Sequence, residues 1–301
     1  MTTVDPTPHI DITIKASNRI ELIESSQLVA RKCRIDFAEQ SNLVHKIFTD
    51  GLSNQLIGWR LAEKPDDMVL VRIYGESTSK LVDRVQELAT IKLLAENNIG
   101  SKLFATFNNG FVYEYLPGTV LNCIDLDHQD IWPLIAKAVS KMHQIKHNWS
   151  MKPSIFDQIR KIINTTDSNN NQSSIGSNSK IPTTDELIRE LEYLEHNLPK
   201  PDLADLVFSH NDLLPRNIIK QSDRCLFIDF EYAGINHRAM DIGNHFCEFA
   251  DIGTKYDPSK CPNDSFKLDW IKVYLAELGF IGNDLEQRTR SLLDEVSFRQ
   301  F

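Results

Sequence analysis

Hydrophobic and polar positions alternate in several short runs between residues 48 and 115, and this two-residue period predicts β-strands. The clearest run is Asp67–Tyr74, in which Arg72 stands among apolar neighbours. Leu103–Phe107 and Phe111–Tyr115 are two further predicted strands, joined by an Asn-Asn-Gly turn. The segment Phe48–Gly58 predicts a strand, a tight turn and another strand. Together these segments predict strands and hairpins in the N-terminal part of the chain.

Farther along the chain, hydrophobic residues recur every three or four positions, which predicts amphipathic helices. The strongest pattern lies at Ile131–Ile145, and the two histidines near its end, His143 and His147, are predicted to be surface or capping residues rather than ligands. Thr183 and Glu186 form a capping-box pattern at the start of another helix. The segments predicted to be helical are Ser25–Arg34, Ser79–Asn97, Ile131–Ile145, Thr183–Leu198, Asp241–Ala250 and Leu285–Phe298.

Two polar segments break this pattern. Met1 to about Ser17 predicts a loose tail with a short strand, and residues 165–180 contain too few apolar side chains to order themselves, which predicts a disordered loop. The strand pattern stops at Leu116–Gly118. We therefore predict an N-terminal lobe of residues 1–116, of which about the first 20 residues are loose, and a C-terminal lobe of residues 117–301.

Composition narrows the class of protein. The net charge of -9 argues against a general nucleic-acid binder, because such proteins usually present a basic face. Five cysteines are scattered without C-x-x-C spacing, which predicts reduced thiols in the cytosol. The N-terminus lacks the apolar stretch of a signal peptide, and no apolar run approaches the length of a membrane span. We therefore predict a cytoplasmic protein that binds no nucleic acid and is not stably inserted in a membrane.

The candidate chemistry lies between residues 208 and 249. Asp212 and Asn217 follow a short apolar run, and Asp229 ends the next apolar run. This spacing resembles the catalytic loop of protein kinases, H-R-D-x-x-x-x-N, which is followed by a metal-binding Asp. Phosphoryl transfer needs a carboxylate that orients the acceptor hydroxyl and takes its proton, and Mg²⁺ prefers hard oxygen ligands. We therefore predict Asp212 as the catalytic base, and Asn217 and Asp229 as ligands of Mg²⁺ on ATP.

Longer stretches resemble the choline/ethanolamine kinase family. They are HNDLL, N-I-I, IDFEYAG and DIGNHFCEF around the candidate site, and FTDGLSN, VLVRIYG and VDRVQE upstream. HNDLL and TDGLSN resemble the ethanolamine kinase branch. The resemblance implies an α+β, two-lobed protein-kinase-like fold, with a small, mostly antiparallel β lobe and a larger helical lobe. It also implies an ATP- and Mg²⁺-dependent ethanolamine kinase that makes phosphoethanolamine for phosphatidylethanolamine synthesis.

The resemblance assigns nucleotide-binding residues in the N-terminal lobe. It implies that the turn around Gly51, Ser53 and Asn54 covers the ATP phosphates, although this turn alone would be an ordinary hairpin. Arg72 takes the place of the lysine that protein kinases direct at the phosphates, since a guanidinium also pairs with phosphate oxygens. Glu87 is then its ion-pair partner on the following helix.

The remaining assignments concern the base and the amino alcohol. The chain leaves the small lobe just after the last predicted strand, so we expect the adenine to contact the backbone around Glu114 and Tyr115. In the family, the Glu of the N-H-F-x-E run contributes to the amino-alcohol pocket, and the Glu of the D-x-E run lies near the metals and the substrate. Asp241 is expected to fix the geometry of the loop instead. The predicted substrate-binding residues are Asp212, Glu231, Tyr232 and Glu248.

Three alternatives stay open. The first is choline as the main or a second substrate, the second is an aminoglycoside- or sugar-type phosphotransferase of the same fold, and the third is a truncated nucleotide-binding protein without turnover. The resemblance covers about Phe48 to Phe301 and lacks the aromatic-rich helices that usually end family members. We expect their lack to weaken substrate binding more than ATP binding and to expose apolar surface, which would favour association, for example into a homodimer, or instability.

Overall fold

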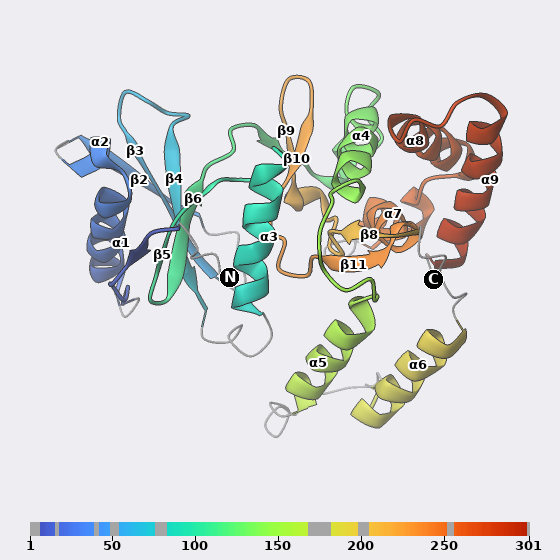
Figure 1. Cartoon of the computed structure of the whole chain (residues 1–301), viewed down its shortest axis with the longest axis horizontal. Coiled ribbons are helices and arrows are strands. Elements are labelled where there is room, and N and C mark those ends of the chain that lie inside the picture. Colours follow the sequence, from blue (N-terminus) through green and yellow to red (C-terminus); the bar gives the residue numbers. More distant parts are fainter. Residues whose placement is uncertain are drawn as a thin grey trace. The chain divides into compact units, whose positions relative to one another are not determined.

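The computed structural model describes residues 7–15, 18–38, 42–48, 54–75, 83–167, 182–197, 205–251 and 256–299. The chain divides into two compact units, unit 1 (Met1–Gly118) and unit 2 (Thr119–Phe301). The predicted lobe boundary, between residues 116 and 117, lies close to this division. Figure 1 shows the main sheet in unit 1 and most of the helices in unit 2.

Unit 1 is built on one sheet that has six strands among its described residues, in the order β1-β5-β6-β4-β3-β2. Neighbouring strands are antiparallel, except that β1 and β5 run parallel. The mostly antiparallel sheet of the N-terminal lobe, which the resemblance to the kinase family implied, is therefore confirmed. The elements of unit 1 are β1 (His9–Ile10), α1 (Arg19–Cys33), α2 (Ile35–Ala38), β2 (Leu43–Phe48), β3 (Asn54–Leu61), β4 (Met68–Tyr74), α3 (Arg84–Glu96), β5 (Leu103–Phe107) and β6 (Gly110–Glu114).

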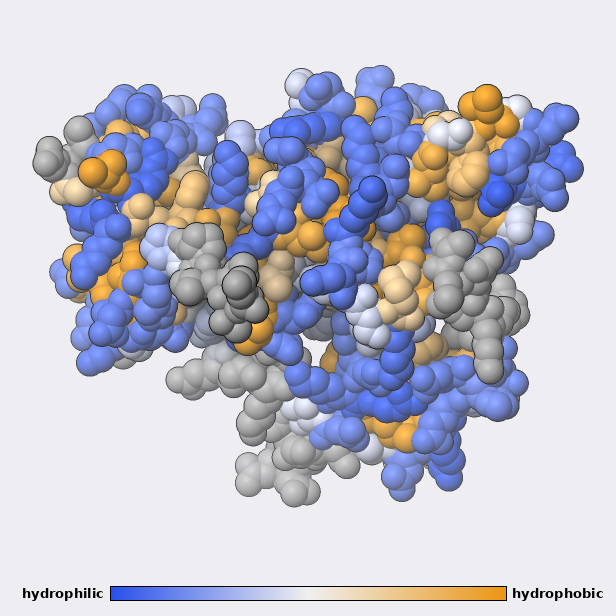
Figure 2. Space-filling model, viewed as in Figure 1, coloured by the Kyte–Doolittle hydropathy of each residue, from blue (hydrophilic) through white to orange (hydrophobic). Residues whose placement is uncertain are grey.

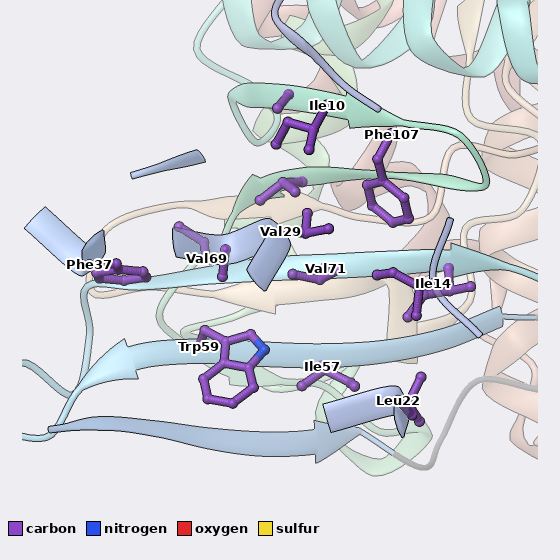
Figure 3. Packing of buried hydrophobic residues seen from close by; sticks show 14 of the residues in the cluster. Ile10, Ile14, Leu22, Val29, Phe37, Ile57, Trp59, Val69, Val71 and Phe107 are labelled. Carbon is purple, nitrogen blue, oxygen red and sulfur yellow. The ribbon is translucent and has the colours of Figure 1, made fainter. Parts of the chain in front are cut away.

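The core of unit 1 lies between this sheet and helix α1. Val69 and Val71 of the central strand β4 are fully buried, next to Trp59 of β3 (Figure 3). From α1, Val29 enters the same cluster, and Ser26 Oγ accepts a hydrogen bond of 3.1 Å from Trp59 Nε1. Each fully buried side chain of this size stabilises the fold by roughly 1.5–3 kcal/mol. The cluster therefore fixes β4, which carries Arg72, against the helix.

The N-terminal tail is ordered where it is described, so the prediction of a loose tail is wrong for residues 7–15. The predicted short strand is β1, which pairs with β5, and both Ile10 and Ile14 are buried in the core. The Asn109 side chain binds the backbone N–H and carbonyl of Ile14, at 2.9 Å each. This polar segment is therefore held in place by two buried apolar side chains and by the pairing of β1 with β5. Residues 1–6 and 16–17 lie outside the described residues.

Helix α3 begins at Arg84, later than the predicted Ser79. Its N-cap is Asp83, whose carboxylate accepts from the amides of Val85 and Gln86 at 3.1 Å. Residues 76–82, which include the start of the predicted helix, lie outside the described residues. Figure 1 shows α1 on one side of the sheet and α3 on the other, in agreement with the burial of β4 on both faces.

Unit 2 combines helices with two small antiparallel sheets, β10-β9-β7 and β11-β8. The pair β8 and β11 is fully buried. The α-helices and strands are β7 (Thr119–Val120), α4 (Trp132–His143), α5 (Ile155–Asp167), α6 (Thr184–Asn197), β8 (Leu206–Ser209), β9 (Ile218–Lys220), β10 (Cys225–Phe227), β11 (Gly234–His237), α7 (Arg238–Cys247), α8 (Asp264–Glu277) and α9 (Gly282–Arg299). Short 3₁₀ helices are η1 (Cys123–Asp125), η4 (Pro215–Asn217), η5 (Glu248–Ala250) and η6 (Pro258–Lys260).

Helices α5 and α6 flank the segment predicted to be disordered. The capping box of α6 is confirmed, because the N–H of Thr183 donates to Glu186 Oε2 at 2.8 Å and the N–H of Glu186 donates to Thr183 Oγ1 at 3.2 Å. The predicted loop 165–180 is wrong for its first three residues, Thr165–Asp167, which continue α5. There the Thr165 hydroxyl donates to the carbonyl of Lys161 at 2.7 Å. Residues 168–180 lie outside the described residues.

The surface is mainly hydrophilic on the face shown in Figure 2, where hydrophobic residues form separate patches rather than one continuous band. Exposed large hydrophobic side chains include Ile20, Ile35, Ile124 and Ile281, which lie in α1, in α2, in η1 and just before α9, respectively. Scattered single residues of this kind are normal on a globular surface. Among the helices that the structure describes, none combines the length and the hydropathy needed to cross a bilayer.

Candidate active site

The buried strand pair β8 and β11 positions the loop that carries Asp212. Strand β8 ends at Ser209, directly before the His210-Asn211-Asp212 run, and Ser209 pairs with Gly234 of β11. His210 is fully buried, with its ring 4.6 Å from that of Phe230. Its Nε2 lies 3.0 Å from the carbonyl oxygen of Ile228, which can only accept, so Nε2 carries the proton. The start of the loop is therefore fixed before Asp212.

The carboxylate of Asp241, on α7, binds two consecutive amides of this loop. Its Oδ2 accepts from the N–H of His210 at 2.9 Å and its Oδ1 from the N–H of Asn211 at 2.8 Å. The N–H of Leu213 donates to Asn244 Oδ1, one turn along α7, at 2.7 Å. Asp241 therefore fixes the loop geometry, as expected. Burial alone would raise the pKa of Asp241, but hydrogen bonds from His143 and from the backbone of His210 outweigh it and lower the pKa.

Asp212 and Asn217 are in direct contact. Asn217 Nδ2 donates to Asp212 Oδ2 at 3.1 Å and to the Asp212 carbonyl at 2.9 Å. This contact forms because η4 turns the chain between them, with the N–H of Asn217 donating to the carbonyl of Leu214 at 2.9 Å. Asn217 is 7% exposed. The amide nitrogen of Asn217 thus holds the carboxylate, which leaves its amide oxygen as the atom that can serve a metal ion.

Asp229 lies shortly after β10, and a backbone hydrogen bond of the preceding residue brings it close to Asn217. The N–H of Ile228 donates to the carbonyl of Asn217 at 2.9 Å, and Asp229 itself has a φ of 64°, in the left-handed region. Non-glycine residues held there are often found at functional sites. Burial raises the pKa of Asp212, and the nearby charge of Asp229 raises it further. Asp212, Asn217 and Asp229 therefore lie close together, as their predicted roles require.

These residues fit a hard divalent cation. Asn217 and Asp229 offer oxygen donors, which Mg²⁺ prefers. Burial, and to a lesser degree the charge of Asp229, raises the pKa of Asp212, and a cation would offset both effects. Within the described ranges, no three His, Cys, Asp or Glu side chains form a cluster that would hold a metal. A Mg²⁺ ion here would therefore need further ligands from phosphates or water, which is its usual coordination in phosphoryl transfer.

The predicted substrate-binding residues surround the same carboxylate. Burial raises the pKa of Tyr232, and the charges of Glu231, Asp212 and Asp229 raise it further, so the phenol lies near all three. Glu248, in η5, is 6% exposed. Burial raises the pKa of Glu248 to about 7, with further contributions from the charges of Asp212 and Asp251. The result is a partly buried, acidic environment, which favours a cationic ligand.

The segment that carries Glu231 and Tyr232 is fixed through its backbone. Asn211 Nδ2 donates to the carbonyl of Tyr232 at 2.9 Å, and Gln158 Nε2, from α5, donates to the same carbonyl at 3.1 Å. Asn211 Oδ1 in turn accepts from Asn236 Nδ2 at 2.8 Å. Asn211 therefore connects the loop of Asp212 to the segment that precedes β11.

In unit 1, the predicted pair of Arg72 and Glu87 forms. Arg72 Nη2 lies 3.5 Å from Glu87 Oε1, and both side chains are largely buried. Glu87 also accepts a shorter hydrogen bond, of 2.8 Å, from Arg84 Nη1. The sequence did not indicate this second partner, although the i, i+3 spacing on a helix would allow it.

The other nucleotide-binding predictions in unit 1 have mixed outcomes. Gly51 and Ser53 lie outside the described residues, and Asn54 is described only as the first residue of β3. The N–H of Glu114 donates to the Lys102 carbonyl at 2.9 Å, and the N–H of Tyr115 donates to the Met68 carbonyl at 3.2 Å. Both N–H groups are used within the sheet, so any contact with a base is limited to the carbonyls and side chains of these two residues.

Sequence reasoning missed the role of His143, which is buried rather than a surface or capping residue. Its Nε2 lies 2.9 Å from Asp241 Oδ2, and its Nδ1 lies 2.8 Å from the hydroxyl of Tyr274. His143 falls beside the apolar stripe of its helix, next to the buried Met142, and that position was the available signal. No local signal marks Tyr274, which lies 131 residues farther along the chain.

A comparison with protein families matches residues 45–300 to the choline/ethanolamine kinase family. Ethanolamine kinase 2 of Mus musculus is 38% identical over 233 residues, which cover 76% of this chain and 59% of that protein. Ethanolamine kinase 1 of Mus musculus is 32% identical over 304 residues, which cover 96% of this chain and 82% of that protein. The matched part of this chain thus spans less than two thirds of the first of these relatives.

A solved structure gives the same result at the level of the fold. The Plasmodium vivax ethanolamine kinase superposes with a TM-score of 0.76 at 26% sequence identity, and the match covers 94% of this chain and 80% of that one. The predicted α+β, protein-kinase-like fold is therefore confirmed. Aligned regions of this extent include both the segment of Arg72 and Glu87 and the segment from His210 to Glu248.

Proposed function

Because this chain belongs to the choline/ethanolamine kinase family, we propose that it transfers the γ-phosphate of ATP to the hydroxyl of ethanolamine. The products would be ADP and phosphoethanolamine, a precursor for phosphatidylethanolamine synthesis. The observation that carries the proposal is the half-buried carboxylate of Asp212, held by Asn217 at 3.1 Å with the charge of Asp229 nearby. Similarity to ethanolamine kinases at 32% and 38% identity supports the choice of substrate.

In the proposed reaction, Asp212 orients the hydroxyl of the substrate and accepts its proton. The hydroxyl oxygen attacks the γ-phosphorus, the bond from this phosphorus to the β–γ bridging oxygen breaks, and ADP leaves with the electron pair. The raised pKa of Asp212 makes its carboxylate a better proton acceptor than an ordinary aspartate. Asn217 and Asp229 would hold Mg²⁺, which when bound supplies positive charge against the phosphate oxygens.

Glu248 is the proposed partner of the substrate ammonium. A primary ammonium carries three N–H donors and is best matched by carboxylate and carbonyl oxygens. The charges that face Glu248 are the carboxylates of Asp212 and Asp251, so this environment favours a cation. Tyr232, whose phenol lies near Asp212, would lie against the same ligand.

Choline is the second candidate substrate. The matched family includes both choline and ethanolamine kinases. A quaternary ammonium has no N–H donor and is bound best by aromatic faces. An acidic site that contains the buried carboxylate of Glu248 therefore favours ethanolamine over choline, by an amount that a direct comparison of kcat/KM would measure.

A substrate panel tests the proposal. Ethanolamine, choline, their methylated intermediates and an aminoglycoside are each assayed with Mg²⁺ and ATP for ADP release. We expect the highest kcat/KM with ethanolamine. Asp212→Asn should abolish turnover and leave ATP binding intact, whereas Asp223→Asn, the same change at an exposed aspartate in unit 2, should leave activity unchanged. ATP binding without turnover of any amino alcohol would instead indicate a nucleotide-binding protein without kinase activity.

A further inference from the structure

The hydroxyl of Tyr274 is connected to the loop of Asp212 through a single histidine. Tyr274, on α8, lies 2.8 Å from His143 Nδ1 on α4, and His143 Nε2 lies 2.9 Å from Asp241 Oδ2 on α7. The same Oδ2 accepts from the N–H of His210 at 2.9 Å. Tyr274, His143 and Asp241 are all buried. Three helices thus meet the loop through one continuous set of hydrogen bonds.

The direction of each hydrogen bond follows from the chemistry of the groups. The lowered pKa of Asp241 keeps it a carboxylate, which can only accept, so His143 Nε2 must carry a proton. Burial lowers the pKa of His143 even against the hydrogen bond to Asp241, so the ring is neutral and Nδ1 has a lone pair. The hydroxyl of Tyr274 must therefore donate to Nδ1.

Arg238 sets the orientation of this hydroxyl. Its Nη1 lies 3.4 Å from the oxygen of Tyr274, and a guanidinium can only donate. The phenol oxygen therefore accepts from Arg238, and its own proton is directed to His143. Arg238 is itself placed by Asp205, at 3.3 Å from its Nε.

The hydrogen bonds that run from Tyr274 to the loop of Asp212 can form only with one tautomer of His143. In the Nε2–H form, the ring donates to Asp241, and Asp241 can bind the amides of His210 and Asn211. In the Nδ1–H form, the Nε2 lone pair would face the carboxylate oxygen at 2.9 Å, and the two would repel. Which tautomer a histidine adopts is set by the hydrogen bond that its other nitrogen makes.

We propose that Tyr274 is a positioning residue. Its hydroxyl donates to Nδ1 and so adds to the preference for the Nε2–H tautomer that Asp241 already sets, and it holds the His143 ring against Asp241 and the backbone that leads to Asp212. The kinetic part of this inference rests on the proposed kinase function. The tautomer and the protection of the loop amides are properties of the folded protein alone, so they can be measured whether or not the protein turns over ethanolamine.

Two variants separate this role from packing. Tyr274→Phe removes the hydroxyl and keeps the ring. This ring stacks on Trp270, with the ring centroids 5.9 Å apart and the ring planes at 14°. Trp270→Phe is the matched control, because it changes the packing against Tyr274 but removes no hydrogen bond of the set. Among the described residues, Trp270 Nε1 has no hydrogen-bond partner.

The test uses the full chain labelled with ¹⁵N-histidine. His143→Gln identifies the signal of His143 among the nine histidines. We expect the wild type and Trp270→Phe to carry the proton on Nε2. In Tyr274→Phe only Asp241 still favours that form, so we expect a measurable minor population with the proton on Nδ1. Hydrogen exchange at the amides of His210 and Asn211 should be about 10- to 100-fold faster in Tyr274→Phe, the range that corresponds to one lost buried hydrogen bond.

Kinetics add a readout that general destabilisation would not give. We expect Tyr274→Phe to lower kcat by about 10-fold or more, with KM for ATP unchanged, because the loop of Asp212 is affected and the residues of unit 1 are not. In His143→Gln, the amide nitrogen of glutamine can donate to Asp241 and has no tautomer to fix. Tyr274→Phe should therefore have little further effect on kcat in the His143→Gln background.

Three results would overturn the proposal. The first is a wild-type His143 with its proton on Nδ1, which needs no variant to fold. The second is a Tyr274→Phe protein whose tautomer and amide exchange match the wild type. The third is a Trp270→Phe protein that shows the same changes as Tyr274→Phe, since the effect would then come from packing. A wild type that turns over no amino alcohol would reject the proposed function only, because the tautomer and exchange measurements would still decide the role of Tyr274.

Discussion

Glu87 binds Arg72 and Arg84 at the same time. Its Oε1 lies 3.5 Å from Arg72 Nη2, and its Oε2 lies 2.8 Å from Arg84 Nη1. The Glu87 side chain is only 3% exposed, so these contacts are poorly screened by water. Arg84 is placed independently, with its guanidinium 4.1 Å from the ring of Tyr74. Arg72 also has an aromatic neighbour, with its guanidinium 5.9 Å from the ring centre of Phe111, so Glu87 and a ring contact each arginine.

We predict that Glu87→Gln raises KM for ATP by about 10-fold and changes kcat less, because a neutral amide orients the Arg72 guanidinium poorly and a phosphate contact contributes to binding. ATP titrations at saturating ethanolamine measure both constants. Arg84→Gln is the control, since it removes the shorter contact and leaves the pair of Arg72 and Glu87. If Arg84→Gln raised KM for ATP as much as Glu87→Gln, Arg72 would not be the group that acts on the nucleotide.

Glu248 gives a pH dependence to substrate binding. Burial raises the pKa of Glu248 to about 7, and the charges of Asp212 and Asp251 contribute further. Only the carboxylate form attracts the substrate ammonium. We therefore predict that KM for ethanolamine rises as the pH falls below 7, and that Glu248→Gln has a high KM with much less pH dependence. Initial rates between pH 5.5 and 8.5, with ATP saturating, would measure this; an unchanged pH dependence in Glu248→Gln would contradict it.

The same shift has a consequence for stability. Between pH 4.5, the ordinary pKa of glutamate, and about pH 7, Glu248 is protonated in the folded protein but ionised in the unfolded chain. The free energy of unfolding therefore falls as the pH rises through this range. Glu248→Gln should therefore stabilise the protein above pH 7, by about 1 kcal/mol after allowance for solvent screening, and should have no effect below pH 4.5. Urea unfolding at pH 4.5 and pH 8 would test the sign.

Local patterns predicted the elements well, because a strand or helix shows its period within a few residues. The period at Asp67–Tyr74 gave β4, and the five-residue spacing of Asp212 and Asn217 gave a contact that one 3₁₀ turn closes. The predictions failed where the partner is distant in the chain. His143 contacts groups 98 and 131 residues away, and no local pattern encodes such a pair.

The N-terminal tail is a second case in which contacts distant in the chain decided the structure. Its polar composition predicted a loose segment, yet Ile10 and Ile14 enter the core and β1 adds to the edge of the sheet at β5. Composition measures how much apolar surface a segment can bury on average. It cannot show that another part of the fold has an edge strand with unpaired backbone groups. Such an edge can bind a short polar segment through backbone hydrogen bonds.

The buried hydrogen bond between Ser26 and Trp59 predicts a stability effect in unit 1. Both residues are almost fully buried, and Ser26 Oγ accepts from Trp59 Nε1 at 3.1 Å. Ser26→Ala would leave the indole N–H without its acceptor, so we predict a loss of about 1–3 kcal/mol in the free energy of unfolding. Urea unfolding followed by tryptophan fluorescence would measure this loss.

The neighbouring Ser25 provides the control for that prediction. Its hydroxyl donates to the carbonyl of Glu21 in the same helix. This carbonyl keeps its backbone hydrogen bond within the helix when the hydroxyl is removed, so Ser25→Ala should change stability by less than about 0.5 kcal/mol. A second check is the pair Ser26→Ala and Trp59→Phe in one chain. Trp59→Phe removes the donor, so the serine change should cost less in that background than alone.

Asn211 combines a left-handed backbone with two side-chain hydrogen bonds. Its φ is 63°, its Nδ2 donates to the Tyr232 carbonyl at 2.9 Å, and its Oδ1 accepts from Asn236 at 2.8 Å. Asn211→Gly keeps the backbone conformation and loses both bonds, whereas Asn211→Ala loses both bonds and is also strained. We predict that each variant raises KM for ethanolamine by about 10-fold, because the segment of Glu231 and Tyr232 loses a contact that positions it.

Asn98 is the matched control for this pair of variants. It is exposed, it has a φ of 56°, and it lies beyond the end of α3 in unit 1. Asn98→Ala should cost about 1 kcal/mol from the backbone alone, Asn98→Gly should cost less, and neither should change KM for ethanolamine. The comparison separates the two properties of Asn211: if Asn211→Gly kept the wild-type KM and only Asn211→Ala raised it, the backbone conformation would account for the effect and the bond to Tyr232 would not position the substrate.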